Sequence, residues 1–209
     1  MNRYAKIVLG FVILAVLLGG SVVLYNNLSK QYKVDNNLTM NPDKHTEGST
    51  KNPETENQNT EGTQENDQEE KAEALDFTVV DKDNQEKTLL SFKGKPVVLN
   101  FWASWCGPCK KEFPDFQKAY EQYGQDVEFV MVNLTDGSRE TKESAESYIK
   151  SENYTLPIYF DTKGDAANTY AIYSIPTTYF IDKDGYIVAS AQGMIQADTL
   201  QTGIDMIRK

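Results

Sequence analysis

The two cysteines of this 209-residue chain stand only two residues apart, in the stretch WASWCGPCKKEFP from Trp102 to Pro114. A disulfide between Cys106 and Cys109 would close a very small loop and would restrain the unfolded chain very little. A purely stabilising role is therefore disfavoured. The pair is expected to carry chemistry or to bind a metal, unless it is an accident of composition.

The residues around the pair predict its structural setting. The apolar run PVVLNFW (96–102) predicts a strand buried on both faces. Residues 107–123 predict a helix with Pro108 in its first turn, where a missing N–H costs nothing. Cys106 would then lie at the helix N-terminus, where unpaired N–H groups and the helix dipole stabilise a thiolate. Such cysteines have pKa values of roughly 3.5–7.5, against ~8.5 for a free thiol. Cys109, one turn deeper and separated by Gly107 and Pro108, is placed to attack a mixed disulfide on Cys106.

Metal and haem binding are poor alternatives for this pair. A structural zinc site needs about four ligands, and the chain offers two cysteines and one distant histidine, His45. A c-type haem site requires C-x-x-C-H, and Lys110 occupies the histidine position. No metal and no cofactor are therefore expected. Two buried, inert cysteines remain an alternative.

Residues 75–209 are predicted to form one α/β domain. Strands alternate with helices along the chain, which favours a central mixed sheet flanked by helices. The expected elements after an initial hairpin in 76–90 are a strand at 96–102, a helix at 107–123, a strand within 126–134, a helix at 138–151, a strand within 156–161, a short helix at 165–170, a hairpin within 176–192 and a final helix at 196–208.

Residues 1–25 are predicted to form an N-terminal signal-anchor. The segment from Ile7 to Tyr25 is uncharged, and a helix of this length, at ~1.5 Å per residue, spans a bilayer core of ~30 Å. Arg3 and Lys6 precede it and favour a cytoplasmic N-terminus. The expectation is a single transmembrane helix in the cell membrane, with the catalytic domain extracytoplasmic. A cleaved signal peptide is the competing interpretation, and both place that domain outside the cytoplasm.

Residues 26–74 are predicted to be a disordered, acidic and polar tether. Positions 34–74 hold eleven acidic residues and three lysines, with few large apolar side chains to offset the entropy of ordering. The whole chain has a formal net charge of -10, which argues against nucleic acid as a partner. The expected role of the tether is to let the anchored domain sample the area around its anchor at the membrane surface.

The active-site stretch carries a resemblance to known proteins. NFWASWCGPCKKEFP resembles the active-site segment of thioredoxin-like proteins. The continuation KKEFP, the anchor and the segment between DVEFVMVN and LPIYFD resemble membrane-anchored TlpA/ResA-like thiol-disulfide oxidoreductases. The resemblance covers about residues 75–209. It implies a thioredoxin-like fold with an N-terminal hairpin extension and a central insertion, with Cys106 as the exposed attacking cysteine and Cys109 as the resolving one.

The resemblance also implies roles around the disulfide. Pro176 matches a cis-proline that faces the cysteines, with an ordinary proline at a strand start as the alternative. The Ile175 backbone would then pair with an extended substrate segment. Trp105 is expected to be partly exposed where partners dock, and Trp102 to be a packing residue.

Two polar positions near the cysteines differ in what they predict. Asn100 stands where many thioredoxins have a buried aspartate that relays a proton. An asparagine cannot take a proton, so this relay is in doubt here. Glu112 matches a ResA-like glutamate that could accept the proton of the resolving cysteine. The alternative is a solvated glutamate on the helix surface beside Lys110 and Lys111.

The expected function is reduction of disulfides in exported proteins. The Gly-Pro dipeptide resembles reducing thioredoxins, and the family implies a CcdA/DsbD-like membrane electron donor. Apocytochrome c, methionine sulfoxide reductase, and sporulation and envelope proteins are the substrates considered by the same resemblance. An oxidase or isomerase of the same fold is the main alternative. A peroxiredoxin-type peroxidase is disfavoured because Ala103 replaces the required threonine, and a non-catalytic binding module remains as a further alternative.

Overall fold

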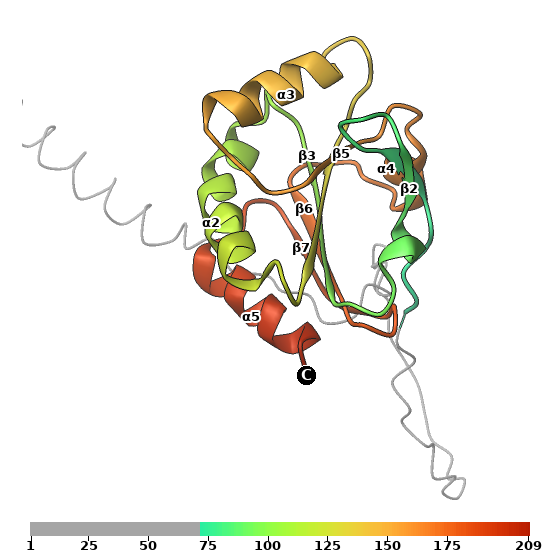
Figure 1. Ribbon diagram of the computed structural model, residues 1–209, viewed down its shortest axis with the longest axis vertical. Helices are drawn as coiled ribbons and strands as arrows, with labels where there is room; N and C mark the ends of the chain where they lie inside the picture. The colour runs from blue at the N-terminus through green and yellow to red at the C-terminus, as the bar shows by residue number, and fades with distance from the viewer. Residues whose placement is uncertain (1–71) are drawn as a thin grey trace, which may run out of the picture. The chain divides into compact units, whose positions relative to one another are not determined.

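The structure, a computed structural model, describes residues 72–209 (Figure 1). One seven-stranded sheet has the order β2-β1-β5-β4-β3-β6-β7. Strands β3, β4 and β5 are parallel to one another, and the remaining pairings are antiparallel. The strands are β1 (Thr78–Val80), β2 (Glu86–Thr88), β3 (Val97–Trp102), β4 (Glu128–Asn133), β5 (Ile158–Phe160), β6 (Thr177–Ile181) and β7 (Ile187–Gln192).

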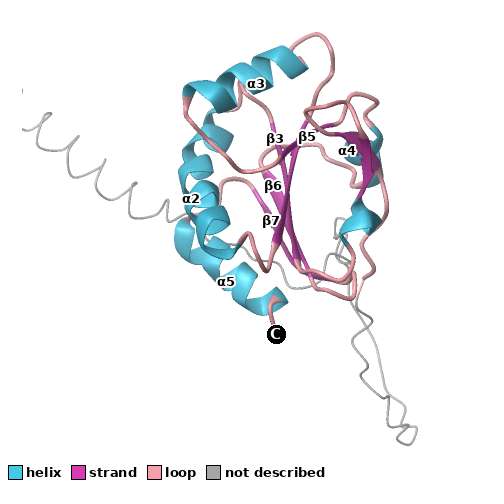
Figure 2. Cartoon of the chain, in the orientation of Figure 1, coloured by secondary structure: helices cyan, strands magenta, loops and turns pink. Residues whose placement is uncertain are grey.

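Helices cover both faces of this sheet. Figures 1 and 2 show α2, α3 and α5 on one side and α4 on the other. The helical elements are η1 (Leu89–Phe92), α2 (Gly107–Tyr123), α3 (Lys142–Ser151), α4 (Asp165–Thr169) and α5 (Ala197–Ile207). The mixed sheet flanked by helices and the N-terminal hairpin β1–β2 confirm the predicted fold, and α3 lies in the segment expected as a central insertion.

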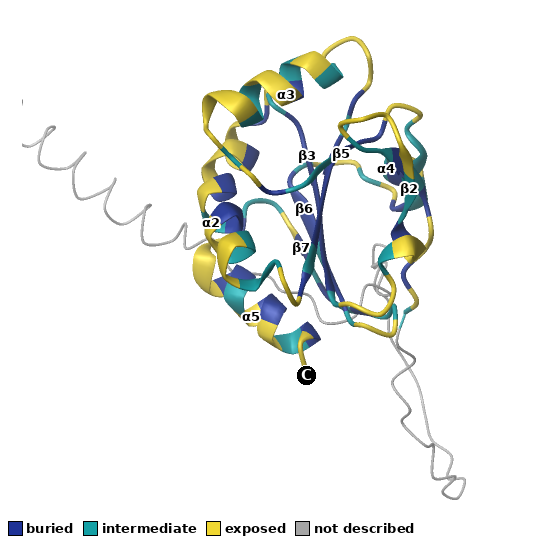
Figure 3. Ribbon diagram, in the orientation of Figure 1, coloured by how far each residue is buried: buried dark blue, intermediate teal, exposed yellow. Residues whose placement is uncertain are grey.

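Strand β3 explains why the sheet has a core on each face. All six of its residues are buried, as the continuous apolar run predicted (Figure 3). Because successive side chains in a strand point to opposite faces, Val98 and Trp102 join the core under α2 and α5. Leu99 and Phe101 join the second core, on the side of α4. The strand thereby anchors the residues that follow it, which include the cysteine pair.

Helix α3 begins later than the sequence predicted. The expected start was Ser138, but the first helical residue is Lys142. The Asp136 carboxylate accepts hydrogen bonds from the backbone N–H groups of Ser138, Arg139 and Glu140, at 2.7, 2.7 and 3.0 Å. This local turn competes with the helix, since short acidic side chains bond readily to nearby backbone. Thr141 then caps the helix.

Sheet pairing begins slightly before the predicted domain start at Leu75. Glu73 forms an isolated bridge with Tyr186, and the Ala74 N–H donates to the Gly185 carbonyl at 2.8 Å. The predicted anchor (1–25) and most of the predicted tether (26–74) lie outside the described residues. Within 72–209, no helix has both the length and the hydropathy needed to cross a bilayer.

Candidate active site

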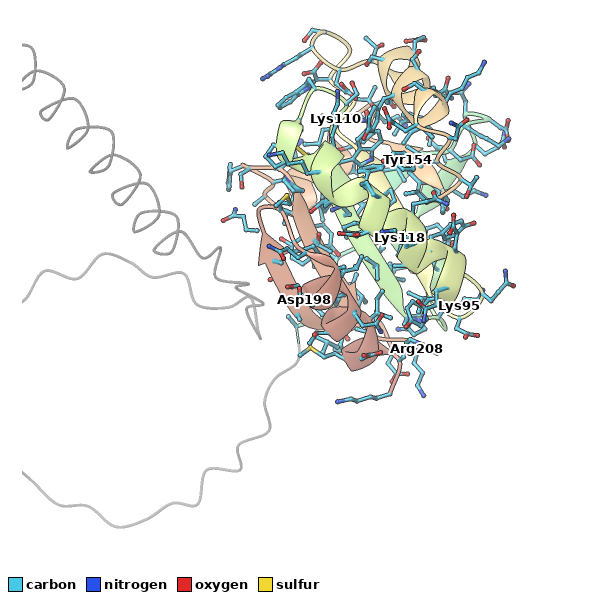
Figure 4. The ribbon with its side chains drawn as sticks, turned by 90° about the vertical axis from the view of Figure 1, so that its left-hand side faces the viewer. Lys95, Lys110, Lys118, Tyr154, Asp198 and Arg208 are labelled. Atoms are coloured by element: carbon cyan, nitrogen blue, oxygen red, sulfur yellow. A yellow bond between two sulfur atoms is a disulfide. The ribbon has the colours of Figure 1, made fainter. Side chains whose placement is uncertain are left out.

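The two cysteines form a disulfide at the N-terminus of α2. Cys106 is the N-cap residue, and its Sγ accepts a hydrogen bond from the Cys109 N–H at 3.2 Å. Gly107 and Pro108 form the exposed first turn between them. Figure 4 shows Lys110, which follows Cys109, at this end of the helix. The predicted position at the mouth of a helix is confirmed.

Cys106 is less accessible than expected. Its exposed fraction is 4%, against 0% for Cys109, so neither sulfur is broadly exposed in the disulfide form. The Ile175 carbonyl oxygen lies 3.8 Å from Cys106 Sγ and covers it from the opposite loop. The expectation of an exposed attacking cysteine was therefore wrong in degree. Cys106 is still the outer of the two sulfurs, as an attacking cysteine must be.

The loop before β6 faces the disulfide. The Ile175–Pro176 peptide bond is cis, as the resemblance implied. Pro176 is buried and Ile175 half-buried. Two hydrogen bonds hold the loop. Thr177 Oγ1 donates to the Ser174 carbonyl at 2.9 Å, and the Gly193 N–H donates to the Pro176 carbonyl at 2.8 Å. The Ile175 backbone makes no backbone hydrogen bond within residues 72–209, and its carbonyl oxygen contacts Cys106 Sγ. Its N–H group is therefore open to pairing with an extended segment.

Glu112 is a buried carboxyl group below the disulfide. Its exposed fraction is 1%, so the alternative of a solvated surface residue was wrong. Its Oε1 accepts from Asn100 Nδ2 at 2.9 Å, and its Oε2 accepts from the Ile195 N–H at 3.1 Å. Burial raises the pKa of Glu112 to about 8, although both hydrogen bonds act to lower it. The group therefore holds a proton at neutral pH. Helical spacing accounts for the burial, because Cys109, Glu112 and Phe113 share one face of α2.

Asn100 connects the sheet to this carboxyl group. It lies fully buried on β3, and its Nδ2 donates both to Glu112 and to Thr178 Oγ1, the latter at 3.0 Å. An amide cannot carry the proton that an aspartate would carry here. Proton binding in this part of the site therefore rests with Glu112. The partner Thr178 on β6 was not anticipated from the sequence.

The burial of Trp102 and the partial exposure of Trp105 are as predicted, and the docking role of Trp105 stays a prediction. Trp102 is fully buried and packs edge-on against Phe113, with ring centroids 4.7 Å apart. Trp105 is 42% exposed next to the disulfide. The guanidinium carbon of Arg139 lies 3.4 Å from the centre of the Trp105 ring.

Sequence reasoning missed a buried link between the active-site segment and the loop before α3. Glu140 is fully buried, and its carboxylate accepts from the Ser104 N–H at 2.8 Å, Ser104 Oγ at 2.7 Å and Asn133 Nδ2 at 2.7 Å. The segment that precedes Cys106 is thereby fixed to β4 and to this loop. No motif marks Glu140 in the sequence, since the loop reads as polar and solvated.

No group of three or more His, Cys, Asp or Glu side chains that could hold a metal ion occurs in the part of the chain that the structure describes. The expectation that the protein needs neither metal nor cofactor stays a prediction. The redox group that the described residues do provide is the disulfide itself.

The fold and the cysteine pair define a thioredoxin-like thiol-disulfide oxidoreductase. A family model described as "AhpC/TSA family" matches residues 71–190. The chain belongs to this family.

Relatives agree with that class. Sporulation thiol-disulfide oxidoreductase A of Bacillus subtilis is 39% identical over 110 residues, which cover 52% of this chain and 66% of the relative, just under two thirds. Thiol-disulfide oxidoreductase ResA of B. subtilis is 32% identical over 138 residues, or 66% of this chain and 75% of the relative. The predicted resemblance to ResA-like proteins is confirmed.

Solved structures show the same fold. The crystal structure of StoA from B. subtilis matches with a TM-score of 0.55 and 33% identity, over 63% of this chain and 98% of that one. The exposed lipoprotein thioredoxin Etrx1 of Streptococcus pneumoniae matches with a TM-score of 0.55 and 33% identity, over 63% and 99%.

Proposed function

We propose that this chain reduces disulfides in exported proteins, using the dithiol form of Cys106 and Cys109. The observation that carries the proposal is the placement of the disulfide at the N-terminus of α2, facing the cis Ile175–Pro176 loop, whose Ile175 N–H makes no backbone hydrogen bond within residues 72–209. A partner segment that pairs with this loop would bring its own disulfide to Cys106.

The reaction begins with the reduced protein. The helix N-terminus and the Cys109 N–H favour the thiolate of Cys106. This thiolate attacks one sulfur of the substrate disulfide, and the other substrate sulfur leaves as a thiolate. Cys109 then loses its proton and attacks Cys106 Sγ, which releases the second substrate thiolate. The substrate gains two electrons and the protein becomes the observed disulfide.

Glu112 supports this cycle by holding the proton of Cys109. In the disulfide form burial keeps the carboxyl group protonated near neutral pH. When an electron donor reduces the disulfide and releases Cys109 as a thiolate, Glu112 can supply its proton. In the opposite half-reaction the carboxylate takes that proton back, as microscopic reversibility requires.

The compartment and the electron donor are part of the proposal. The apolar segment 7–25 and the acidic segment 34–74 would tether the domain to the outer surface of the cell membrane, with the N-terminus cytoplasmic. A CcdA/DsbD-like membrane protein would then supply electrons. Apocytochrome c, methionine sulfoxide reductase, and sporulation and envelope proteins are candidate substrates, and one relative is itself named for sporulation.

A reductase assay with insulin tests the reaction. The full chain should accelerate insulin precipitation by dithiothreitol, and Cys106→Ser should abolish the effect. Cys109→Ser should accumulate mixed disulfides, since the resolving thiol is missing. Refolding of a scrambled disulfide protein in place of insulin reduction would instead indicate an isomerase, and reduction of hydrogen peroxide without insulin reduction would indicate a peroxidase.

A further inference from the structure

Three cationic side chains lie in segments next to the disulfide, in a domain that is acidic overall. Residues 75–209 hold twenty acidic and fourteen basic side chains. Lys110 and Lys111 follow Cys109 directly on α2, and both are exposed. Arg139 is exposed in the loop between β4 and α3. Three basic residues thus lie in two segments next to the disulfide, although the domain as a whole holds more acidic than basic side chains.

Two of these cations, Lys110 and Arg139, lie over aromatic rings. Arg139 stacks on Trp105 at 3.4 Å, which holds its charge beside the residue that precedes Cys106. Lys110 Nζ lies 5.0 Å from the centre of the Tyr148 ring. None of the ion pairs found within residues 72–209 involves Lys110, Lys111 or Arg139. Their charges thus remain available to a partner.

The acidic residues close to these cations in sequence, all within the described part of the chain, form no ion pair with them. The Asp136 carboxylate is exposed and keeps its negative charge, because the N–H groups of its own loop bind its Oδ1 and lower its pKa to about 2. Glu140 is buried and occupied by Ser104 and Asn133. Glu112 is buried and faces Asn100 and Ile195.

Two exposed aromatic residues complete this surface. Trp105 precedes Cys106 and is 42% exposed, and Tyr173 lies two residues before Ile175 and is 92% exposed. Aromatic and arginine side chains are enriched where partners bind. Trp105 lies in the turn that follows β3, and Tyr173 lies in the chain that leads into the cis-proline loop. These are the two segments that meet at the disulfide.

We propose that Trp105, Lys110, Lys111, Arg139 and Tyr173 form a docking face for an acidic peptide segment that adjoins the partner's disulfide. The inference rests on the proposed function and specifies its substrate class. Complementary charge steers encounter and excludes wrong partners, here those with basic residues next to the cysteine. An anionic membrane surface is the other chemistry that a basic face can bind. It is disfavoured because the rest of the domain is acidic and because this face must meet the partner's sulfur.

The test uses three disulfide peptides of equal length whose cysteines are flanked by acidic, neutral or basic residues. The reduced full chain is mixed with each peptide, and the second-order rate constant is measured at ionic strengths of about 0.01 M and about 1 M. The acidic peptide should react about tenfold faster than the basic one at low salt, and this ratio should approach one at high salt. Arg139→Gln and the double variant Lys110→Gln/Lys111→Gln should lower the ratio of acidic to neutral rates several-fold. Lys118→Gln, further along α2 (Figure 4), is the matched control and should keep the wild-type ratio.

Two outcomes would overturn the docking face alone: equal rates for all three peptides, or inhibition by phosphatidylglycerol vesicles that Arg139→Gln relieves, which would assign the face to a membrane. Failure to reduce any of the peptides would overturn the proposed function as well. The two failures are therefore distinguishable.

Discussion

Asn100 Nδ2 donates a 2.9 Å hydrogen bond to Glu112 Oε1 in the interior below the disulfide. The bond joins the central strand of the sheet to the helix that carries both cysteines. It stabilises the carboxylate form of Glu112, but burial has the larger effect and raises the pKa to about 8. The pKa of Glu112 therefore depends on the burial of this carboxyl group and on its hydrogen bonds.

The first prediction concerns Glu112 and the pH dependence of stability. The folded protein keeps the Glu112 proton up to about pH 8, whereas the unfolded chain releases it near its ordinary value of 4.5. The contribution of the protonated Glu112 side chain to the unfolding free energy is fully present below pH 4.5 and is lost as the pH rises toward 8. Relative to Glu112→Gln, the wild type should lose roughly 1.4 kcal/mol of unfolding free energy per pH unit in this window. Urea unfolding of the disulfide form across pH measures the difference, and parallel curves would show that Glu112 is ionised when folded.

The second prediction concerns Asn100→Asp. This change places a second carboxyl group beside Glu112 and removes an amide donor to Thr178. Two adjacent buried carboxyl groups cannot both ionise cheaply, so one proton should be retained to higher pH. The variant should be less stable than the wild type by about 1–3 kcal/mol at alkaline pH, and by less under acidic conditions. Asn168→Asp, at an exposed position on α4, is the control and should show no such pH dependence.

The third prediction concerns the buried link made by Glu140. Glu140→Ala leaves the donors of Ser104 and Asn133 without their acceptor, which should cost about 1–3 kcal/mol of stability. Glu140→Gln should recover part of the loss because one amide oxygen remains. Trp105 fluorescence should change in the alanine variant, since Arg139 directly precedes Glu140 and stacks on the Trp105 ring. Glu152→Ala, exposed at the end of α3, serves as the control. Full stability in Glu140→Ala would refute the link.

The fourth prediction concerns the packing of α5 on the sheet. Gly203 is buried against the Phe180 ring, and a Cβ at this position would overlap the ring. Gly203→Ala should therefore lower the unfolding free energy by about 1–3 kcal/mol, although alanine favours helix. Thr202→Ala, its exposed neighbour, should change stability far less. A more stable Gly203→Ala would show that Phe180 can move aside without cost.

Local patterns predicted the fold and the catalytic pair well. The uniform apolar run of β3 and the proline in the first turn of α2 placed Cys106 correctly, because both depend on neighbours in sequence. The start of α3 was wrong because one side chain, Asp136, captured the backbone that would have begun the helix.

Long-range polar contacts were not predictable in the same way. The partners of Glu112 on β3 and before α5 lie 12 and 83 residues away in sequence. The contact of Glu140 with Ser104 spans 36 residues. A glutamate that follows two lysines looks solvated until the helix is placed on its sheet. The cis-Pro176 loop and Cys106 were paired only through family resemblance, since nothing in their spacing of 70 positions brings them together.

The reduction potential of the disulfide in the purified full chain tests the central claim most directly. It is obtained by equilibration in a series of dithiothreitol redox buffers, with alkylation of the free thiols as the readout. A reductase supplied with electrons through the membrane should have a potential below about −240 mV, near the thioredoxin end of the range. A potential above about −180 mV would contradict the account and indicate an oxidase or an isomerase.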